Sequence, residues 1–249
     1  IINNSYSVQD NKLDLFAEFM PNLERQFRVG ITANYVHLRD NLFHQVDADN
    51  YDFITYGYFN YYINNEDSPT YASRGWKFNL NGKYIVPVVE LEDGSMTEHS
   101  IVLRADIDGS IAVGRRHSLK LGATIGTSML YEEPPLSYQF FVGGQSHMKY
   151  FDNIISFDGL KFTQLYGDHI TMAKISWQYN IYKSIYAIAN FNGGYVASDY
   201  DNWFSDESFV FGCGLTLGMN TMAGPIEISL TGSNRCSNLV GFLNVGYWF

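Results

Sequence analysis

The last stretch of the chain, residues 239–249, reads LVGFLNVGYWF and sets the class of fold. Side chains at odd positions, such as Leu243 and Val245, point to one face of an extended segment, and even positions such as Asn244 and Gly246 point to the other. Neither face carries a charge. This alternation with a period of two indicates a β-strand whose odd-numbered face is apolar over its whole length.

The same alternation runs upstream through the whole chain. In each segment an uncharged, mostly apolar face lies opposite a face with glycine, serine, threonine, amides or scattered charges. The segments are 2–8, 13–19, 27–35, 51–63, 76–84, 101–108, 119–125, 169–182, 184–196, 208–220, 226–231 and 239–249. We count about twelve strands and no convincing helical period, so the chain is expected to be all-β.

The composition narrows the class of function. Charged residues make up 17% of the 249 residues, below the roughly 25% of soluble domains, and the net charge is −10. An acidic chain lacks the basic stripe that binds nucleic acid, so no nucleic-acid partner is expected. The apolar content of 46% excludes disorder, and no apolar run is long enough for a membrane-spanning helix.

Two architectures accommodate alternating strands, and they differ in the direction of the apolar face. A soluble barrel or sandwich turns that face inward, whereas a transmembrane barrel turns it toward lipid and lines its lumen with polar residues. The uncharged apolar faces and the Gly- and amide-rich opposite faces favour a transmembrane antiparallel β-barrel. So do the connections, which alternate between short (21–25, 64–69, 114–117, 182–184 and 221–224) and long (39–50, 87–97, 130–168 and 197–207).

Ten charged residues are predicted to face the lumen. Both signs occur, so these side chains can form ion pairs across it. Because the long connection 130–168 is available to fill the lumen, we expect a plugged barrel rather than an open pore. The ten residues are Asp14, Glu18, Arg28, Asp52, Lys77, Arg104, Asp106, Lys120, Lys174 and Glu227.

The chain carries no recognisable catalytic motif. Ser146 and His147 lie near two glycines, but outside the strand–turn–helix context of a nucleophile elbow. His117, Ser118 and His169 lie at strand ends, where polar residues are ordinary. The six histidines lack metal-ligand spacing, so neither a metal nor a cofactor is expected. Whether the parent protein is an enzyme stays open.

A family resemblance begins with the run FFVGG at 140–144. It precedes a long insertion that contains ISFDGL at 155–160; five strands follow, and AGPIE at 223–227 opens the penultimate one. This layout resembles the C-terminal barrel of the BamA/TamA superfamily, also called the bacterial surface antigen family, in which the long loop folds into the lumen. The terminal Tyr247 and Phe249 resemble the signal by which the barrel assembly machinery recognises outer-membrane barrels.

The loop motif departs from the superfamily pattern. The resemblance marks a lumenal-loop motif (Gly143, Gly144, Phe157, Asp158, Gly159 and Leu160) and a strand that faces it (Asn192, Gly193 and Gly194). Superfamily members place an Arg in the loop and an Asp on a nearby strand, and the two form an ion pair. Both are replaced here, so we expect packing of Phe157 and Leu160 and neutral hydrogen bonds to hold the loop.

Within the superfamily, the chain is most similar to patatin-like phospholipases of the Bacteroidetes type. The similar stretches are 153–160, 175–182, 224–227 and 245–249. This resemblance implies that residues 1–249 form a single outer-membrane barrel domain, the C-terminal part of a longer protein with a lipid acyl hydrolase upstream. The superfamily's barrels usually have sixteen strands, so these would be the last twelve; a closed barrel of twelve strands is the alternative.

The resemblance leaves three functions open. The first is a barrel that anchors and positions a patatin-like phospholipase at the bacterial outer membrane. The second is a BamA/TamA-like barrel for protein insertion or secretion, and the third is a stand-alone porin or surface-binding barrel. The implied partners are outer-membrane lipids and the barrel assembly machinery, and a homodimer is left open.

Overall fold

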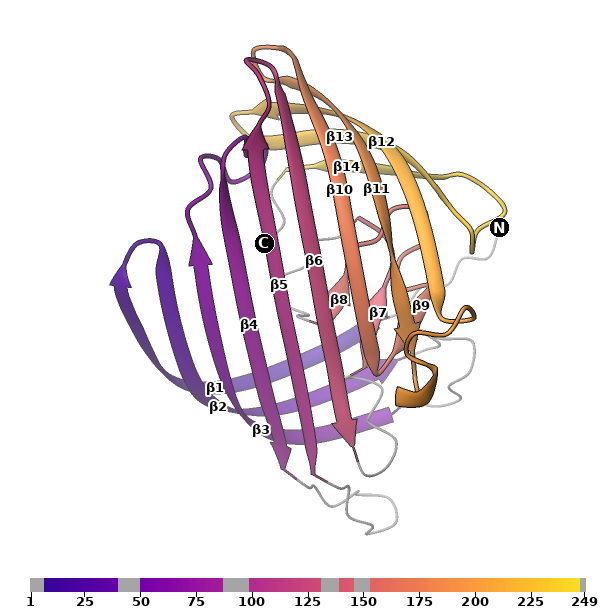
Figure 1. Ribbon diagram of the computed structural model, residues 1–249. Coiled ribbons are helices and arrows are strands. Elements are labelled where there is room, and N and C mark those ends of the chain that lie inside the picture. Colours follow the sequence, from indigo (N-terminus) through magenta and orange to yellow (C-terminus); the bar gives the residue numbers. More distant parts are fainter. Residues whose placement is uncertain (1–6, 40–49, 87–98, 131–138, 146–152, 247–249) are drawn as a thin grey trace.

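The computed structural model describes residues 7–39, 50–86, 99–130, 139–145 and 153–246. Its main element is an antiparallel sheet of eleven strands that curls around a central space; neighbouring strands follow one another along the chain, except that β6 pairs with β10 (Figure 1). The strands are β1 (Ser7–Asn22), β2 (Arg25–Arg39), β3 (Asn50–Asn64), β4 (Gly75–Val86), β5 (Ser100–Ala112), β6 (His117–Leu130), β10 (His169–Tyr182), β11 (Ile185–Ala197), β12 (Phe209–Thr221), β13 (Gly224–Ser233) and β14 (Val240–Val245).

The connection between β6 and β10 forms a second, small sheet. Its strands are β7 (Phe140–Val142), β8 (Ile154–Ile155) and β9 (Leu165–Gly167), in the order β8-β7-β9. Figure 1 shows this small sheet inside the curl of the large one. The predicted all-β fold and the inward course of the long connection are therefore confirmed.

The strand count differs slightly from the prediction. The segment predicted at 2–8 is not a separate strand in the described part of the chain, because Ser7 and Val8 begin β1 and residues 2–6 lie outside the described residues. Each of the other eleven predicted segments overlaps one strand of the large sheet; the last, 239–249, is a strand from Val240 to Val245, and residues 247–249 lie outside the described part of the chain. Within the described residues β1 and β14 do not pair with each other, so the sheet is not closed.

Burial along β12 shows which way the two faces point. Exposed and buried residues alternate from Phe209 to Met219. Leu215 is 68% exposed on the outer face, while its neighbour Thr216 is buried and shares a 2.8 Å hydrogen bond with Ser229 of β13. Leaving a leucine in water forgoes about 1.5–3 kcal/mol, so an outer face of this kind fits a hydrocarbon environment and not a solvated surface.

Short connections gather at one end of the sheet. Two residues join β1 to β2, β10 to β11, and β12 to β13, and four residues join β5 to β6. The connection between β3 and β4 lies at the same end but runs for ten residues, 65–74, which is longer than the predicted turn at 64–69. Among the described residues, no helix is long and apolar enough to cross a membrane.

Candidate functional site in the lumen

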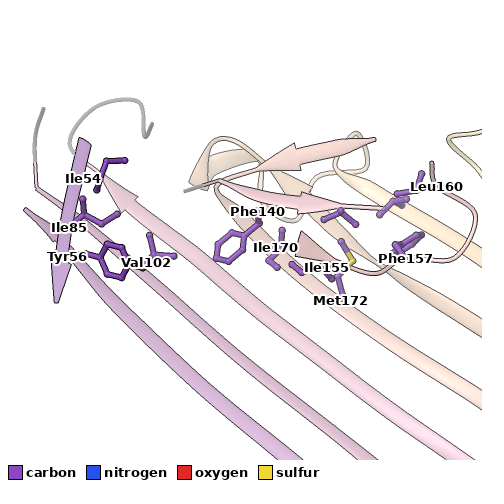
Figure 2. Packing of buried hydrophobic residues seen from close by; sticks show 12 residues of the cluster. Ile54, Tyr56, Ile85, Val102, Phe140, Ile155, Phe157, Leu160, Ile170 and Met172 are labelled. Atoms are coloured by element: carbon purple, nitrogen blue, oxygen red, sulfur yellow. The ribbon is translucent and has the colours of Figure 1, made fainter. Parts of the chain in front are cut away.

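The inner loop, defined here as residues 139–145 and 153–168, fills part of the lumen with apolar side chains. Phe140, Val142, Phe157 and Leu160 are at most 2% exposed. Figure 2 shows Phe140, Ile155 and Phe157 beside Ile170 and Met172 of β10, with a neighbouring group from β3–β5. The cluster lies on the lumenal side of the wall, so the inner loop is packed against the sheet and does not float in the lumen.

The loop motif predicted from the sequence forms one compact unit. The backbone N–H of Gly144 donates to the Leu160 carbonyl over 3.1 Å, and the N–H of Phe157 donates to the Gly144 carbonyl over 2.9 Å. Gly143, Gly144 and Gly159 all have positive φ angles. These bonds bring the two halves of the motif together and present Asp158 to the wall.

Asp158 makes the principal contact between the inner loop and the wall. Its side chain is 1% exposed, and its Oδ2 lies 3.0 Å from Nζ of Lys174 on β10. The Gln145 amide Nε2 donates to Oδ1 over 2.6 Å. The expectation that neutral bonds alone complement the packing is therefore wrong, because a lysine on the wall balances the buried carboxylate.

The residues that receive the loop form one row across four strands. Register places Lys174 opposite Asn192, Asn192 opposite Gly212, and Gly212 opposite Ser233. The Asn192 amide donates to the Asp158 carbonyl over 3.3 Å, and the Ser233 hydroxyl donates to the Gly159 carbonyl over 2.8 Å. We call these four residues the upper row, where upper means the side away from the short connections, which is drawn toward the bottom of Figure 1.

Gly212 occupies the upper row at the point of closest approach. A Cβ built at this position would overlap the carbonyl oxygen of Asp158. Only a glycine leaves the space that lets the loop backbone lie directly on β12.

Only one residue of the predicted loop-facing strand contacts the loop. Asn192 binds it, but Gly193 lies on the outer face, where a Cβ would meet only ordinary contacts at 3.6 Å or more. Gly194 faces Thr171 and Met172 of β10 instead. The predicted assembly signal, Tyr247 and Phe249, lies outside the described residues, so its role stays a prediction.

Sequence reasoning missed three anchoring residues. Lys174 was predicted to face the lumen but was given no partner, because its partner lies on a loop. Gln145 directly follows the FFVGG run, and Ser233 ends β13. No local signal marks either of them, since both act through contacts that depend on how the sheet curls.

The remaining lumenal charges pair mainly along the wall. Lys77 Nζ lies 3.4 Å from Asp108 on the neighbouring strand, and an Arg104 nitrogen lies 2.8 Å from Asp106 on its own strand. Arg28 contacts Glu18, its register partner, over 2.7 Å. Pairing across the lumen was expected, but in these cases the partners are neighbours.

A cavity of about 850 Å³ lies between the inner loop and residues 65–74. Tyr71, Lys120, Phe157, Asp158, Lys174 and Ser176 contribute to its lining. Carboxylates, lysines and amides share this lining with apolar side chains such as Ile155 and Met172, so the cavity presents both polar and apolar surface.

The histidines weighed as catalytic candidates have structural surroundings. The His117 ring stacks on Tyr179 with centroids 4.8 Å apart, and the His169 ring stacks on Trp203 at 4.9 Å. Ser146 and His147 lie outside the described residues. In the described ranges, no group of three or more His, Cys, Asp or Glu is placed to hold a metal ion.

Comparison with known proteins identifies the family. The model of the OMP85 superfamily matches residues 2–249. The chain belongs to the OMP85 superfamily. No curated protein matches the chain.

Two solved structures are similar to this OMP85 chain. It is similar to the crystal structure of BamA from Haemophilus ducreyi lacking POTRA domains 1–3, with a TM-score of 0.69 and 11% identity over 97% of this chain and 56% of that one. It is also similar to CdiB from Escherichia coli, with a TM-score of 0.61 and 12% identity over 95% of this chain and 44% of that one. At such identities the likeness shows the fold, and the chain spans about half of each structure.

Proposed function

We propose that the chain is the membrane-embedded barrel of a bacterial outer-membrane protein that inserts or secretes polypeptides. Membership of the OMP85 superfamily and the fold shared with BamA and CdiB support this function. The outward apolar face supports the membrane location.

The observation that carries the proposal is the anchored inner loop. A buried carboxylate, its lysine and a glycine-bearing row hold the loop against β10–β13. A stand-alone porin needs a continuous aqueous path, and a loop fixed in this way obstructs one. The loop instead supplies a bound element whose release can change the state of the lumen.

The expected anchoring of a patatin-like phospholipase stays a prediction that rests on sequence resemblance alone. Its substrate would be membrane lipid, whereas the substrate of an insertase or secretion barrel is a polypeptide. One experiment therefore separates the two functions.

The test compares the native full-length protein with a variant carrying Asp158→Lys in its own bacterium. Membrane fractionation first checks that both proteins reach the outer membrane. We expect the variant to lower the amount of folded outer-membrane proteins or of secreted polypeptides at least several-fold, because two like charges then meet at the anchor.

The double variant Asp158→Lys with Lys174→Asp restores opposite charges and serves as the matched control. It should recover much of the lost activity. A change confined to phospholipid composition, with polypeptide traffic intact, would overturn the proposal in favour of the hydrolase anchor.

A further inference from the structure

The connection between β3 and β4, residues 65–74, is folded into the lumen, and we call it the lumenal turn. Tyr71 and Ala72 are only 4% and 2% exposed. Other connections at this end need two to four residues, whereas this one orders ten. Fixing each residue costs on the order of 1–2 kcal/mol, so contacts inside the lumen must offset the ordering.

Tyr71 is seated on a second row of residues, which we call the lower row. Register places Tyr186 opposite Gly218, Gly218 opposite Glu227, and Glu227 opposite Asn244. The Tyr71 ring stacks on Tyr186, with centroids 4.2 Å apart and planes 19° apart. Its hydroxyl donates to Glu227 Oε1 over 2.9 Å.

Gly218 makes room for this side chain. A Cβ built there would overlap the hydroxyl end of Tyr71. The lower row thus resembles the upper row. In each, a glycine of β12 lies under the inserted residue, and its register partners on β11 and β13 carry hydrogen-bonding side chains. Burial, followed by the nearby Glu227 carboxylate, raises the pKa of the Tyr71 phenol, which therefore stays a neutral donor.

Wall residues also hold the backbone of the lumenal turn. The Gln178 amide Nε2 donates to the carbonyls of Tyr71 and Ala72 over 3.3 and 3.4 Å, and to the Ser118 hydroxyl over 3.1 Å. Lys120 Nζ donates to the Thr70 carbonyl over 3.5 Å. Contacts therefore reach from β6 across β10 and β11 to β13.

The turn also carries its own internal support. Asp67 accepts from the Ser73 hydroxyl over 2.6 Å and from the Ser73 and Arg74 backbone N–H groups over 2.8 and 3.2 Å. These bonds join residues six and seven positions apart, so they close the base of the turn on both sides of Tyr71.

Position along the strands shows what the lumenal turn covers. Its wall contacts lie within a few residues of the short connections at 183–184 and 222–223. Residues of the upper and lower rows are six apart on β11, β12 and β13, or roughly 20 Å at 3.3 Å per residue. The inner loop and the lumenal turn thus lie at different heights, with the cavity between them.

We propose that the lumenal turn is a second plug, which closes the lumen at the end with the short connections and must withdraw Tyr71 from the lower row before that end opens. The inference rests on the membrane placement of the proposed function, but it does not depend on which substrate the barrel handles. In a barrel of this kind the short connections face the periplasm. The plug therefore controls entry from that side.

The test measures access to a cysteine placed between the two plugs. Ser176 is buried, lines the cavity and belongs to neither row, so Ser176→Cys reports on the space between them. The native Cys213 and Cys236 are replaced by serine. The full-length protein, reconstituted in vesicles with a known orientation, is treated with a membrane-impermeant maleimide from the side of the short connections.

We expect slow labelling with the lumenal turn intact and at least tenfold faster labelling after Tyr71→Ala. Gly218→Ala, which expels the phenol without altering the turn, should accelerate labelling in the same direction. Gly193→Ala is the matched control, because its outward Cβ meets only ordinary contacts, and it should leave the rate unchanged.

Heat-modifiable migration on gels verifies that each variant is folded, and Gly218→Ala, which leaves the sequence of the turn unchanged, covers the case in which Tyr71→Ala does not fold. Equal labelling rates in the parent and in folded Gly218→Ala or Tyr71→Ala would overturn the second plug. Failure of the polypeptide-traffic assay would leave this result untouched, so the two proposals fail separately.

Discussion

The inner loop and the lumenal turn occupy the same wall but are held by different forces. A buried carboxylate paired with Lys174 anchors the inner loop, whereas the lumenal turn is held by the stacked ring of Tyr71 and by hydrogen bonds with Gln178, Lys120 and Glu227. Ion pairs respond to charge reversal, while stacked aromatic contacts respond to loss of volume. Because the two contacts respond to different changes, we expect the two plugs to be released independently.

Truncation of Tyr71 should give the largest effect. Tyr71→Ala removes a 4% exposed aromatic ring and is expected to lower the free energy of unfolding by about 3 kcal/mol. Denaturant unfolding in lipid vesicles measures it. Tyr182→Ala is the control at the same end, because Tyr182 is 60% exposed, and it should cost clearly less. Equal losses would show that Tyr71 is not seated as described.

Removal of the Lys174 charge should give the second-largest loss in the free energy of unfolding. Lys174→Met leaves the Asp158 carboxylate buried without its counter-charge and should cost about 2 kcal/mol, below the 3–5 kcal/mol of a fully buried pair because Lys174 is 38% exposed. Adding Asp158→Asn removes the stranded charge and should recover part of the loss. If the double variant is no more stable than the single one, the pair does not anchor the loop.

Loss of the hydrogen bond between Tyr71 and Glu227 should lower the free energy of unfolding by less than either change above. Tyr71→Phe keeps the stack on Tyr186 and removes the donor to Glu227, so we expect a loss of about 1 kcal/mol. The same unfolding assay detects it. A loss as large as that of Tyr71→Ala would mean that the bond, and not the ring, holds the turn, and the comparison between the two plugs would have to be redrawn.

Acid should produce the smallest effect, confined to the lumenal turn. Although partial burial raises the pKa of Asp67, hydrogen bonds from Ser73 and the Arg74 backbone lower it below its ordinary value of 3.8 overall. A depressed pKa contributes stability that is present at neutral pH and lost as pH falls through the folded-state value. The free energy of unfolding should therefore fall slightly below pH 4, and Asp67→Asn should flatten that dependence in the same unfolding assay.

The fold could be predicted from the sequence because period-two alternation is a local property. The alternation within residues 208–220 predicts that Leu215 and Leu217 lie on the outer face, whichever strands pair with this one. Both side chains are exposed, which confirms the prediction. The inward turn after the FFVGG run was predicted from the family resemblance, not from a local pattern. Strand ends were less accurate, since β1 runs to Asn22, beyond the predicted segment 13–19.

The two docking rows could not be predicted, because they exist only once the register is known. Tyr71 and Glu227 are 156 residues apart, and the stretch around Pro69 has the composition of any surface turn. Lys174 illustrates the same limit: its direction was predicted correctly, but its partner lies on a loop whose path no local pattern encodes.

Glu227 belongs to two contacts at once, because its other oxygen accepts from the Asn244 amide of β14 over 3.4 Å. When the Tyr71 side chain leaves this site, the Glu227 carboxylate loses one hydrogen bond, and its remaining bond to Asn244 of β14 can change its geometry. Opening of the end with the short connections and the hold of β13 on β14 are thereby thermodynamically coupled. A substrate that binds the Glu227 carboxylate affects both, and a change in β14 alters the affinity for that substrate in return.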